Sequence, residues 1–277
     1  MHNLALCLHR MGHVVTGSDD VIYDPARSRL ERANLLPAQM GWDESRITTD
    51  IDLVILGMHA KSDNPELTKA QEYNLDIQSF PEFVGNQASQ KKKIVIAGSH
   101  GKTTTSSMLL HSLSRLKMET DYLIGAQLKG FDLMVKLTEE AEMIVLEGDE
   151  YLSSALDSRS KFLHYDPDIC ILTGLEWDHV NVFPTYESYL DSFQQLVDSM
   201  RPESTLIYNQ YDSKVEKWVK DQNPSCLVMT YFEATWNWVG KEAHLLIDDQ
   251  TVVEFNFPGD HNVINSLGAL RALSLIS

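Results

Sequence analysis

Short apolar runs alternate with amphipathic stretches along most of the chain, a pattern typical of α/β proteins. The runs DLVILG (52–57) and KIVIAG (93–98) are continuously apolar and end in glycine, which favours parallel strands buried on both faces. Apolar residues recur at helical spacing in 186–200. We expect strands at 13–17, 52–57, 75–80, 93–98, 121–126, 143–150, 169–174 and 205–209, several short β segments in 226–257, and helices at 2–11, 26–36, 64–74, 80–89, 102–117, 186–200, 212–220 and 260–276.

This alternation runs through both halves of the chain and predicts two α/β domains with mainly parallel sheets. The polar, basic segment QASQKKK (87–93) is interpreted as the linker, so the domains are expected at 1–90 and 91–277. The first domain is Rossmann-like, but it begins at helix 2–11. In a nucleotide-binding βαβ unit a strand and a glycine-rich turn precede that helix, and both would lie upstream of Met1.

Composition excludes several classes of protein. The 277 residues are 43% apolar and 23% charged, with a formal net charge of −17, which argues against a basic nucleic-acid-binding surface. No signal peptide and no apolar run long enough for a membrane span are found. Three widely spaced cysteines (Cys7, Cys170 and Cys226) indicate reduced, buried thiols in a cytosolic protein.

The segment GSHGKTT carries the strongest chemical signal, because it follows an apolar strand and opens a helix. Its residues are Gly98, Ser99, His100, Gly101, Lys102, Thr103 and Thr104. Glycines there let backbone amides turn toward phosphates, the helix N-terminus adds partial positive charge, Lys102 adds a full charge, and the Thr103 hydroxyl suits a Mg²⁺ shell. The strict pattern G-x-x-x-x-G-K-[ST] fails because residue 96 is isoleucine, so the loop is two residues shorter.

Acidic residues follow two further strands. Glu147, Asp149 and Glu150 end the strand at 143–150, and Asp178 and His179 follow the strand at 169–174. Open α/β sheets bind ligands at this end of their strands. Because acids repel a triphosphate unless a metal lies between them, Glu147 is a candidate Mg²⁺ ligand. A solvated acidic turn and a structural histidine are the alternatives.

The last predicted helix begins with another polar group, His261, Asn262 and Asn265. Asparagine offers both a donor and an acceptor, which suits the edge of adenine. Capping and first-turn hydrogen bonding of the helix is an equally good explanation of these residues taken alone.

Taken in order, GSHGKTTT, EGDE, EWDH and GDHNVIN resemble the motifs of the Mur ligase family, and TGSDD and GMHAKSDNPEL resemble its UDP-binding domain. The resemblance covers nearly the whole chain. It implies a Rossmann-like UDP-binding domain, then a P-loop-type central ATPase domain, with ATP and Mg²⁺ as cofactors and a bacterial, cytoplasmic location. It also implies a third, C-terminal domain, which would lie beyond residue 277.

The same resemblance implies a role for each matching residue. Lys102 would contact the β- and γ-phosphates, Thr103 and Glu147 one Mg²⁺, and His179 a second. His261, Asn262 and Asn265 would hold adenosine, and Ser18, Asp19 and His59 would line the UDP side. Gly174 departs from the family, which often has asparagine there, so the contact of that side chain stays open.

The segment EGDEYLSSALDSRSKFLHYDP (147–167) contains an insertion that resembles one subgroup of the family. That subgroup joins UDP-N-acetylmuramate to the murein tripeptide L-Ala-γ-D-Glu-meso-diaminopimelate in peptidoglycan recycling, through an acyl phosphate. The alternatives are the alanine-adding ligases and a non-catalytic nucleotide-binding module. A P-loop GTPase is disfavoured by the short loop and the lack of an NKxD-like segment. Arg159 and Lys161 are either substrate contacts or solvated charges.

Overall fold

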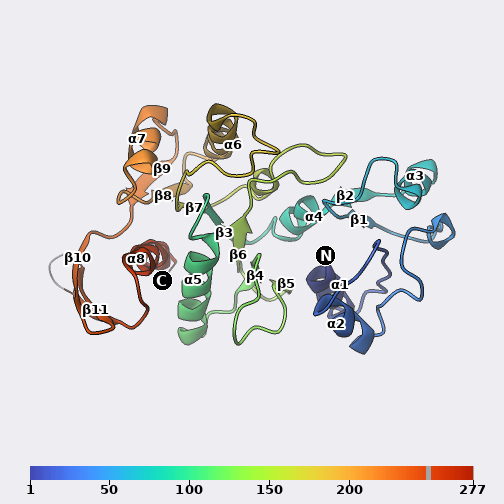
Figure 1. Cartoon of the computed structure of the whole chain (residues 1–277), viewed down its shortest axis with the longest axis horizontal. Helices are drawn as coiled ribbons and strands as arrows, with labels where there is room; N and C mark the ends of the chain where they lie inside the picture. The colour runs from blue at the N-terminus through green and yellow to red at the C-terminus, as the bar shows by residue number, and fades with distance from the viewer. Residues whose placement is uncertain (248–250, 277) are drawn as a thin grey trace.

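A sheet of buried strands forms the centre of the molecule, as the apolar runs predict (Figure 1). The structure, a computed structural model, describes residues 1–247 and 251–276. The order of the seven strands is β5, β4, β6, β3, β7, β8, β9, and all pairs are parallel except β4–β5. Their bounds are Lys92–Ala97 (β3), Asp121–Leu123 (β4), Val135–Lys136 (β5), Met143–Gly148 (β6), Ile169–Leu172 (β7), Thr205–Tyr208 (β8) and Leu227–Thr230 (β9). The carboxyl ends of β6, β3 and β7 therefore lie side by side.

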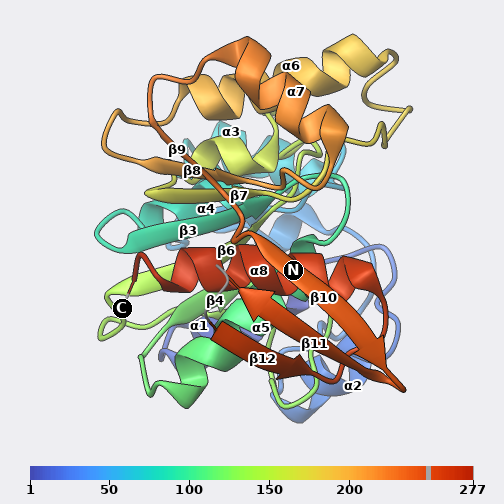
Figure 2. The same cartoon turned by 90° about the vertical axis from the view of Figure 1, so that its left-hand side faces the viewer.

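Both faces of this sheet are covered, which explains its continuously apolar strands. On β3, Val95 and Ala97 face one core, whereas Ile94 and Ile96 face the other. Figure 2 shows α6 and α7 on one side of the sheet, with α5 and α8 on the other. The helices concerned are α4 (Phe80–Gln87), α6 (Tyr186–Asp198) and α7 (Ser213–Gln222) in the first core, and α5 (Lys102–Arg115) and α8 (Asp260–Leu273) in the second.

Of the β segments expected in 226–257, β9 joins the central sheet and the other three form a second, antiparallel sheet. Its strands are β10 (Ala234–Val239), β11 (Glu242–Ile247) and β12 (Thr251–Phe255). Ala243 and Leu245 of β11 pack into the same core as Leu267 of α8. The small sheet therefore supports the last helix (Figure 2).

The N-terminal part is a smaller α/β unit. It contains α1 (His2–Arg10), α2 (Ala26–Arg32), η1 (Glu44–Arg46), β1 (Val54–Leu56), α3 (Pro65–Glu72), β2 (Ile77–Ser79) and α4. β1 and β2 pair in parallel. The Asn-Pro start predicted for α3 is confirmed, because the Asn64 side chain accepts hydrogen bonds from the amides of Glu66 and Leu67. Ser79 and Glu82 form a capping box at α4.

Two close approaches connect this part to the central sheet. Leu4, Leu6 and Cys7 of α1 belong to the same core as Val135 of β5. In α4, a Cβ added at Gly85 would lie 2.2 Å from the carbonyl oxygen of His164, at the end of η2 (Lys161–His164). Glycine therefore allows α4 to pack directly against η2.

Two predictions need correction. Residues 13–17 do not form a strand, because within the described residues no neighbouring strand pairs with them; Val14 is 98% exposed. The linker is also shorter than 87–93, since β3 begins at Lys92. Lys93 is buried and ion-paired with Asp166 (Nζ–Oδ2 3.1 Å), so a basic residue here is part of the folded sheet.

Candidate active site

The turn between β3 and α5 has the backbone of a phosphate loop. Gly98 and Gly101 have φ values of 128° and 79°, a region that favours glycine. A Cβ at Gly98 would lie 2.4 Å from Oγ1 of Thr173, so no other residue fits there without displacement. The turn therefore runs close to the end of β7, and α5 begins at Lys102.

Lys102 lies folded over this turn. Its Nζ donates to the Gly98 carbonyl oxygen and, at 2.9 Å, to Oε2 of Glu150. Glu150 is fully buried, and its other carboxylate oxygen lies 3.4 Å from the Tyr189 hydroxyl of α6. An anion entering the loop would meet a lysine already held beside it by a buried carboxylate.

A second pair lies at the end of β6. The Thr103 hydroxyl donates to Oε1 of Glu147 at 2.9 Å, and the Gly125 amide donates to Oε2 at 3.1 Å. A hydroxyl and a carboxylate in contact are hard oxygen donors of the kind that Mg²⁺ prefers. Among the residues that the structure describes, no three His, Cys, Asp or Glu side chains are grouped to hold a metal alone. An ion at this pair would therefore need phosphate or water oxygens as well.

His179 lies on the other side of Glu150. Its Nε2 is 3.6 Å from Oε1 of Glu150, and its ring meets that of Tyr151 edge-to-face with centroids 5.1 Å apart. The φ of His179 is 54°, an uncommon conformation for a residue other than glycine. The predicted residues Lys102 and His179 thus approach one carboxylate from two sides.

The contacts of Glu150, Tyr151 and Tyr189 were not predicted. Glu150 was noted only as part of an acidic motif, although its place at a strand end is the signal that could have identified it. Burial and the Glu150 carboxylate raise the pKa of Tyr189, so this hydroxyl stays protonated. No local pattern indicates Tyr189, which reaches the site from α6.

Of the two basic residues in the insertion, Lys161 lies at the site and Arg159 does not contact it. Lys161 Nζ donates to Oδ2 of Asp149 at 2.6 Å. Burial opposes ionisation of Asp149, but the charge and hydrogen bond of Lys161 outweigh it and hold the pKa of Asp149 below its usual range. Arg159 pairs with Asp157 in its own loop and is more than half exposed.

Gly174 makes room for the loop histidine. A Cβ at Gly174 would lie 2.3 Å from Cε1 of His100. The His100 ring also lies beside Ser99, whose Oγ is 2.9 Å from Nδ1 and accepts a hydrogen bond from the Glu176 amide. His100 thus occupies the space that a larger residue would need at position 174. Thr104 lies in the first turn of α5.

The polar group at the start of α8 reaches the same loop through one residue. Asn265 is buried, and its Oδ1 would be 2.7 Å from a Cβ added at Gly101. Asn262 is half-buried and donates to the Pro258 carbonyl oxygen at 2.7 Å, and His261 is exposed beside Gly259. The structure therefore brings Asn265 to the loop and leaves the other two side chains at the rim.

The residues expected on the UDP side lie in the N-terminal part. The Ser18 hydroxyl donates to Oε1 of Glu66 at 2.7 Å and accepts from the Arg46 guanidinium at 2.7 Å. Asp19 is exposed near the amino group of Met1, and its charge partly offsets the effect of burial, which lowers the pKa of that amine. His59 is exposed in the turn after β1.

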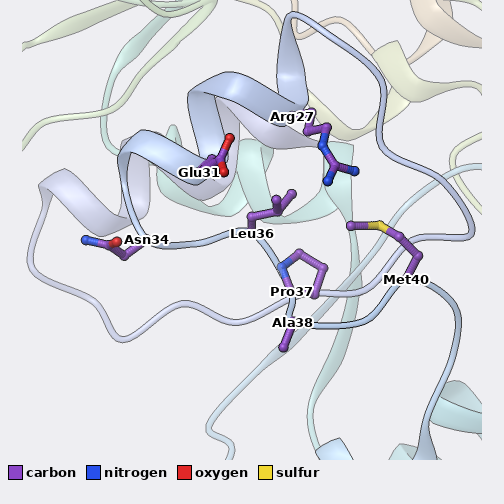
Figure 3. A pocket seen from close by; sticks show the side chains of 7 residues that line it. All are labelled: Arg27, Glu31, Asn34, Leu36, Pro37, Ala38 and Met40. Carbon is purple, nitrogen blue, oxygen red and sulfur yellow. The ribbon is translucent and has the colours of Figure 1, made fainter.

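An open pocket of about 470 Å³ lies elsewhere, beside α2 (Figure 3). Its lining residues are Arg27, Glu31, Asn34, Leu36, Pro37, Ala38 and Met40. None of them belongs to the predicted site. None of the described helices is long and apolar enough to cross a membrane.

Comparison with curated proteins finds two groups of relatives. The UDP-N-acetylmuramate–L-alanyl-γ-D-glutamyl-meso-2,6-diaminoheptandioate ligase of Escherichia coli K12 is 30% identical over 280 residues, covering 98% of this chain and 61% of the relative. The UDP-N-acetylmuramate–L-alanine ligase of Syntrophomonas wolfei is 29% identical, covering 98% and 59%. The chain thus spans less than two thirds of the length of these relatives.

Solved structures and family models agree on the fold. The UDP-N-acetylmuramate:L-alanyl-γ-D-glutamyl-meso-diaminopimelate ligase of Neisseria meningitides has a TM-score of 0.89 and 25% identity, covering 100% of this chain and 90% of that one. A murein peptide ligase of Psychrobacter arcticus has a TM-score of 0.82 and 25% identity, covering 100% and 63%. The Mur ligase family catalytic domain model matches residues 1–92, and the Mur ligase middle domain model matches residues 96–273. The chain therefore belongs to the Mur ligase family.

Proposed function

We propose that this chain is the UDP-binding and ATP-binding part of an ATP-dependent amide-bond ligase acting in peptidoglycan recycling. The observation that carries the proposal is the convergence at one sheet edge of a glycine loop, Lys102, the Thr103–Glu147 pair and the Glu150–His179 pair. Family membership supports the reaction class.

In this reaction the carboxylate of UDP-N-acetylmuramate attacks the γ-phosphorus of ATP, forming an acyl phosphate and releasing ADP. The amine of the peptide then attacks the acyl carbon, loses a proton, and expels inorganic phosphate. Lys102 exchanges its contacts with Gly98 and Glu150 for phosphate oxygens. The loop amides after Gly98 hold the same phosphates. Catalysis is then positioning and neutralisation of charge.

The oxygen donors of the Thr103–Glu147 pair fit Mg²⁺. Thr103 and Glu147 would hold one ion, and His179 would hold a second near the reacting carboxylate. Bound there, the ions would neutralise the charge of the two anions that must meet. His261, Asn262 and Asn265 would surround adenosine, with Asn265 the member that adjoins the loop.

We assign the UDP-sugar to the N-terminal part, beside Ser18, Asp19 and His59, in a cytoplasmic bacterial enzyme that acts on neither nucleic acid nor membrane. The murein tripeptide is proposed as the amine because the first relative is named for it. Alanine is the second candidate, because other relatives of almost equal identity are named for alanine addition.

The test is phosphate release by the full-length protein with ATP and UDP-N-acetylmuramate, comparing the tripeptide with alanine. Faster phosphate release with the tripeptide supports the tripeptide as the amine substrate. Faster release with alanine supports alanine instead. Release that needs neither UDP-N-acetylmuramate nor an amine would refute a ligase.

Replacing Lys102 by alanine provides the residue-level check. Removal of the charge that meets the phosphates is expected to lower turnover by about a thousandfold or more. Lys217→Ala, an exposed lysine of α7, is the matched control and should leave turnover unchanged. Near-normal turnover of Lys102→Ala would contradict the assignment.

A further inference from the structure

The backbone of His179 is held in a conformation that it would not adopt alone. Its φ of 54° lies in the left-handed region, which is unfavourable for a residue other than glycine. Its carbonyl oxygen accepts hydrogen bonds from the amides of Val182 at 2.8 Å and Phe183 at 2.9 Å. The turn that follows therefore fixes the backbone position of His179. It does not fix the rotation of the imidazole ring.

Two neighbours limit that rotation. Glu150 lies 3.6 Å from Nε2, and the Tyr151 ring stands at 83° to the imidazole. Edge-to-face contacts of this kind are favourable beyond the area that they bury. The imidazole is thus in contact on one side with a carboxylate and on another with an aromatic ring.

Tyr151 is itself fixed from three directions. Its hydroxyl accepts a hydrogen bond from the Asn181 side chain at 2.8 Å, and the Lys161 ammonium lies 5.7 Å from its ring centroid. Its amide donates to Oδ1 of Asp149 at 3.1 Å, and its carbonyl oxygen accepts from the Lys161 amide at 2.9 Å. The first two contacts restrain the Tyr151 side chain and the other two its backbone, so the ring can hold a neighbouring ring in place.

We propose that Tyr151 is a positioning residue that sets the orientation of His179. The inference rests on the proposed function and deepens it. Tyr151 acts through the imidazole and not on the substrate, and Lys161 and Asn181 act through Tyr151. The insertion thereby helps to position the proposed metal ligand His179, in addition to any contact with the peptide.

The experiment measures Mn²⁺ binding to the full-length protein, because metal affinity reports on His179 without turnover. Free Mn²⁺ is followed by electron paramagnetic resonance with β,γ-imido-ATP and UDP-N-acetylmuramate present. His179→Ala identifies the class of Mn²⁺-binding sites whose affinity depends on the imidazole. Tyr151→Leu removes the ring contact, Tyr151→Phe keeps it, and Tyr23→Leu, an exposed tyrosine elsewhere, is the matched control.

Tyr151→Leu is expected to weaken that class about fivefold. Tyr151→Phe keeps the ring and loses only the hydrogen bond from Asn181, so it should weaken the class by less, about twofold, as should Asn181→Leu. The double variant Tyr151→Leu/His179→Ala should bind no more weakly than His179→Ala, a result that a general structural role would not give. If Tyr151→Leu does not fold, Asn181→Leu tests the same chain of contacts and should weaken the class in the same direction.

Wild-type Mn²⁺ binding in Tyr151→Leu or in Asn181→Leu, or additive losses in the double variant, would overturn the inference alone. Unchanged binding in His179→Ala would instead overturn the proposed role of His179, and this inference with it. Tyr23→Leu should match wild type throughout.

Discussion

Glycines decide how closely the loops of the site approach one another. Gly98 lies against Thr173, Gly101 against Asn265, and Gly174 against His100. In each pair a Cβ added to the glycine would overlap its neighbour. At Gly98 and Gly101 the backbone also has positive φ, so space and conformation both require glycine. At Gly174 only the lack of space requires glycine, so a substitution there tests the steric contact alone.

Gly174→Asn is expected to lower the free energy of unfolding by about 1–3 kcal/mol, because the new Cβ overlaps the His100 ring. Denaturant unfolding of the full-length protein measures it. Adding His100→Ala should recover most of the loss, since the clashing ring is gone. Gly17→Asn is the matched control, because a Cβ there meets nothing within 4 Å. Equal stability of Gly174→Asn and wild type would show that the ring moves freely.

Motif residues were easier to predict than their partners. Lys102, Thr103, Glu147 and His179 all lie near the ends of parallel strands, and adjacent strands bring such ends together. Contacts that cross between elements carry no such signal. The approach of Tyr189 from α6 to Glu150 depends on how a helix packs on the sheet, which local spacing does not encode.

Helices and strands were predicted well where a regular apolar pattern extends over many residues. They were predicted poorly where a segment forms a strand only if another strand pairs with it. The helices begin at or close to the predicted Asn64, Lys102 and Asp260, because caps and turn glycines are local signals. Residues 13–17 have the composition of a strand, but no strand within 1–247 and 251–276 pairs with them. Likewise, the KKK segment at 91–93 has the composition of a linker, because the ion-pair partners of Lys91 and Lys93 lie far along the chain.

One of those lysines supports the sheet edge formed by β4 and β5. Lys91 Nζ lies 3.0 Å from Oδ2 of the fully buried Asp121, and it donates to the carbonyl oxygens of Thr138 and Ala141 at 2.6 and 2.7 Å. The same carboxylate accepts hydrogen bonds from the amide and hydroxyl of Thr138. A buried ion pair thus ties Lys91, the residue before β3, to β4 and to the connection between β5 and β6.

Lys91→Met should lower the free energy of unfolding by about 3–5 kcal/mol, because it leaves the Asp121 charge buried without a cation. Denaturant titration is the measurement. Lys220→Met, which breaks an exposed helical pair with Glu216, should leave the free energy of unfolding close to that of wild type. Similar losses in the two variants would mean that Asp121 is solvated.

At the scale of the whole molecule, the N-terminal part and the central sheet share one hydrophobic core. Leu4 of α1, Phe83 of α4 and Val135 of β5 belong to it, together with Phe193 of α6. The N-terminal part, to which we assign the UDP-sugar, and the turn between β3 and α5 are therefore held at a set spacing. The three cysteines lie in this same core, which bears on their chemistry.

Burial raises the pKa of Cys170 to about 12 and also raises the pKa values of Cys7 and Cys226. Since only the thiolate reacts, alkylation of native Cys170 at pH 8 should be more than about a thousandfold slower than that of an exposed thiol. Peptide mapping after iodoacetamide treatment measures this. Ser89→Cys, at an exposed position, supplies the fast-reacting reference. Rapid labelling of native Cys170 would show that its core opens readily.

The packing of α1 against β5 also bears on self-association. β5 is the outer strand on its side of the sheet, and outer strands expose unpaired backbone groups that recruit other chains. With α1 beside it, β5 is shielded. At the opposite margin β9 leaves Leu227 and Val228 exposed. Loss of α1 would therefore leave both margins of the sheet bare, and the shortened protein would be prone to aggregate even though its phosphate loop were intact.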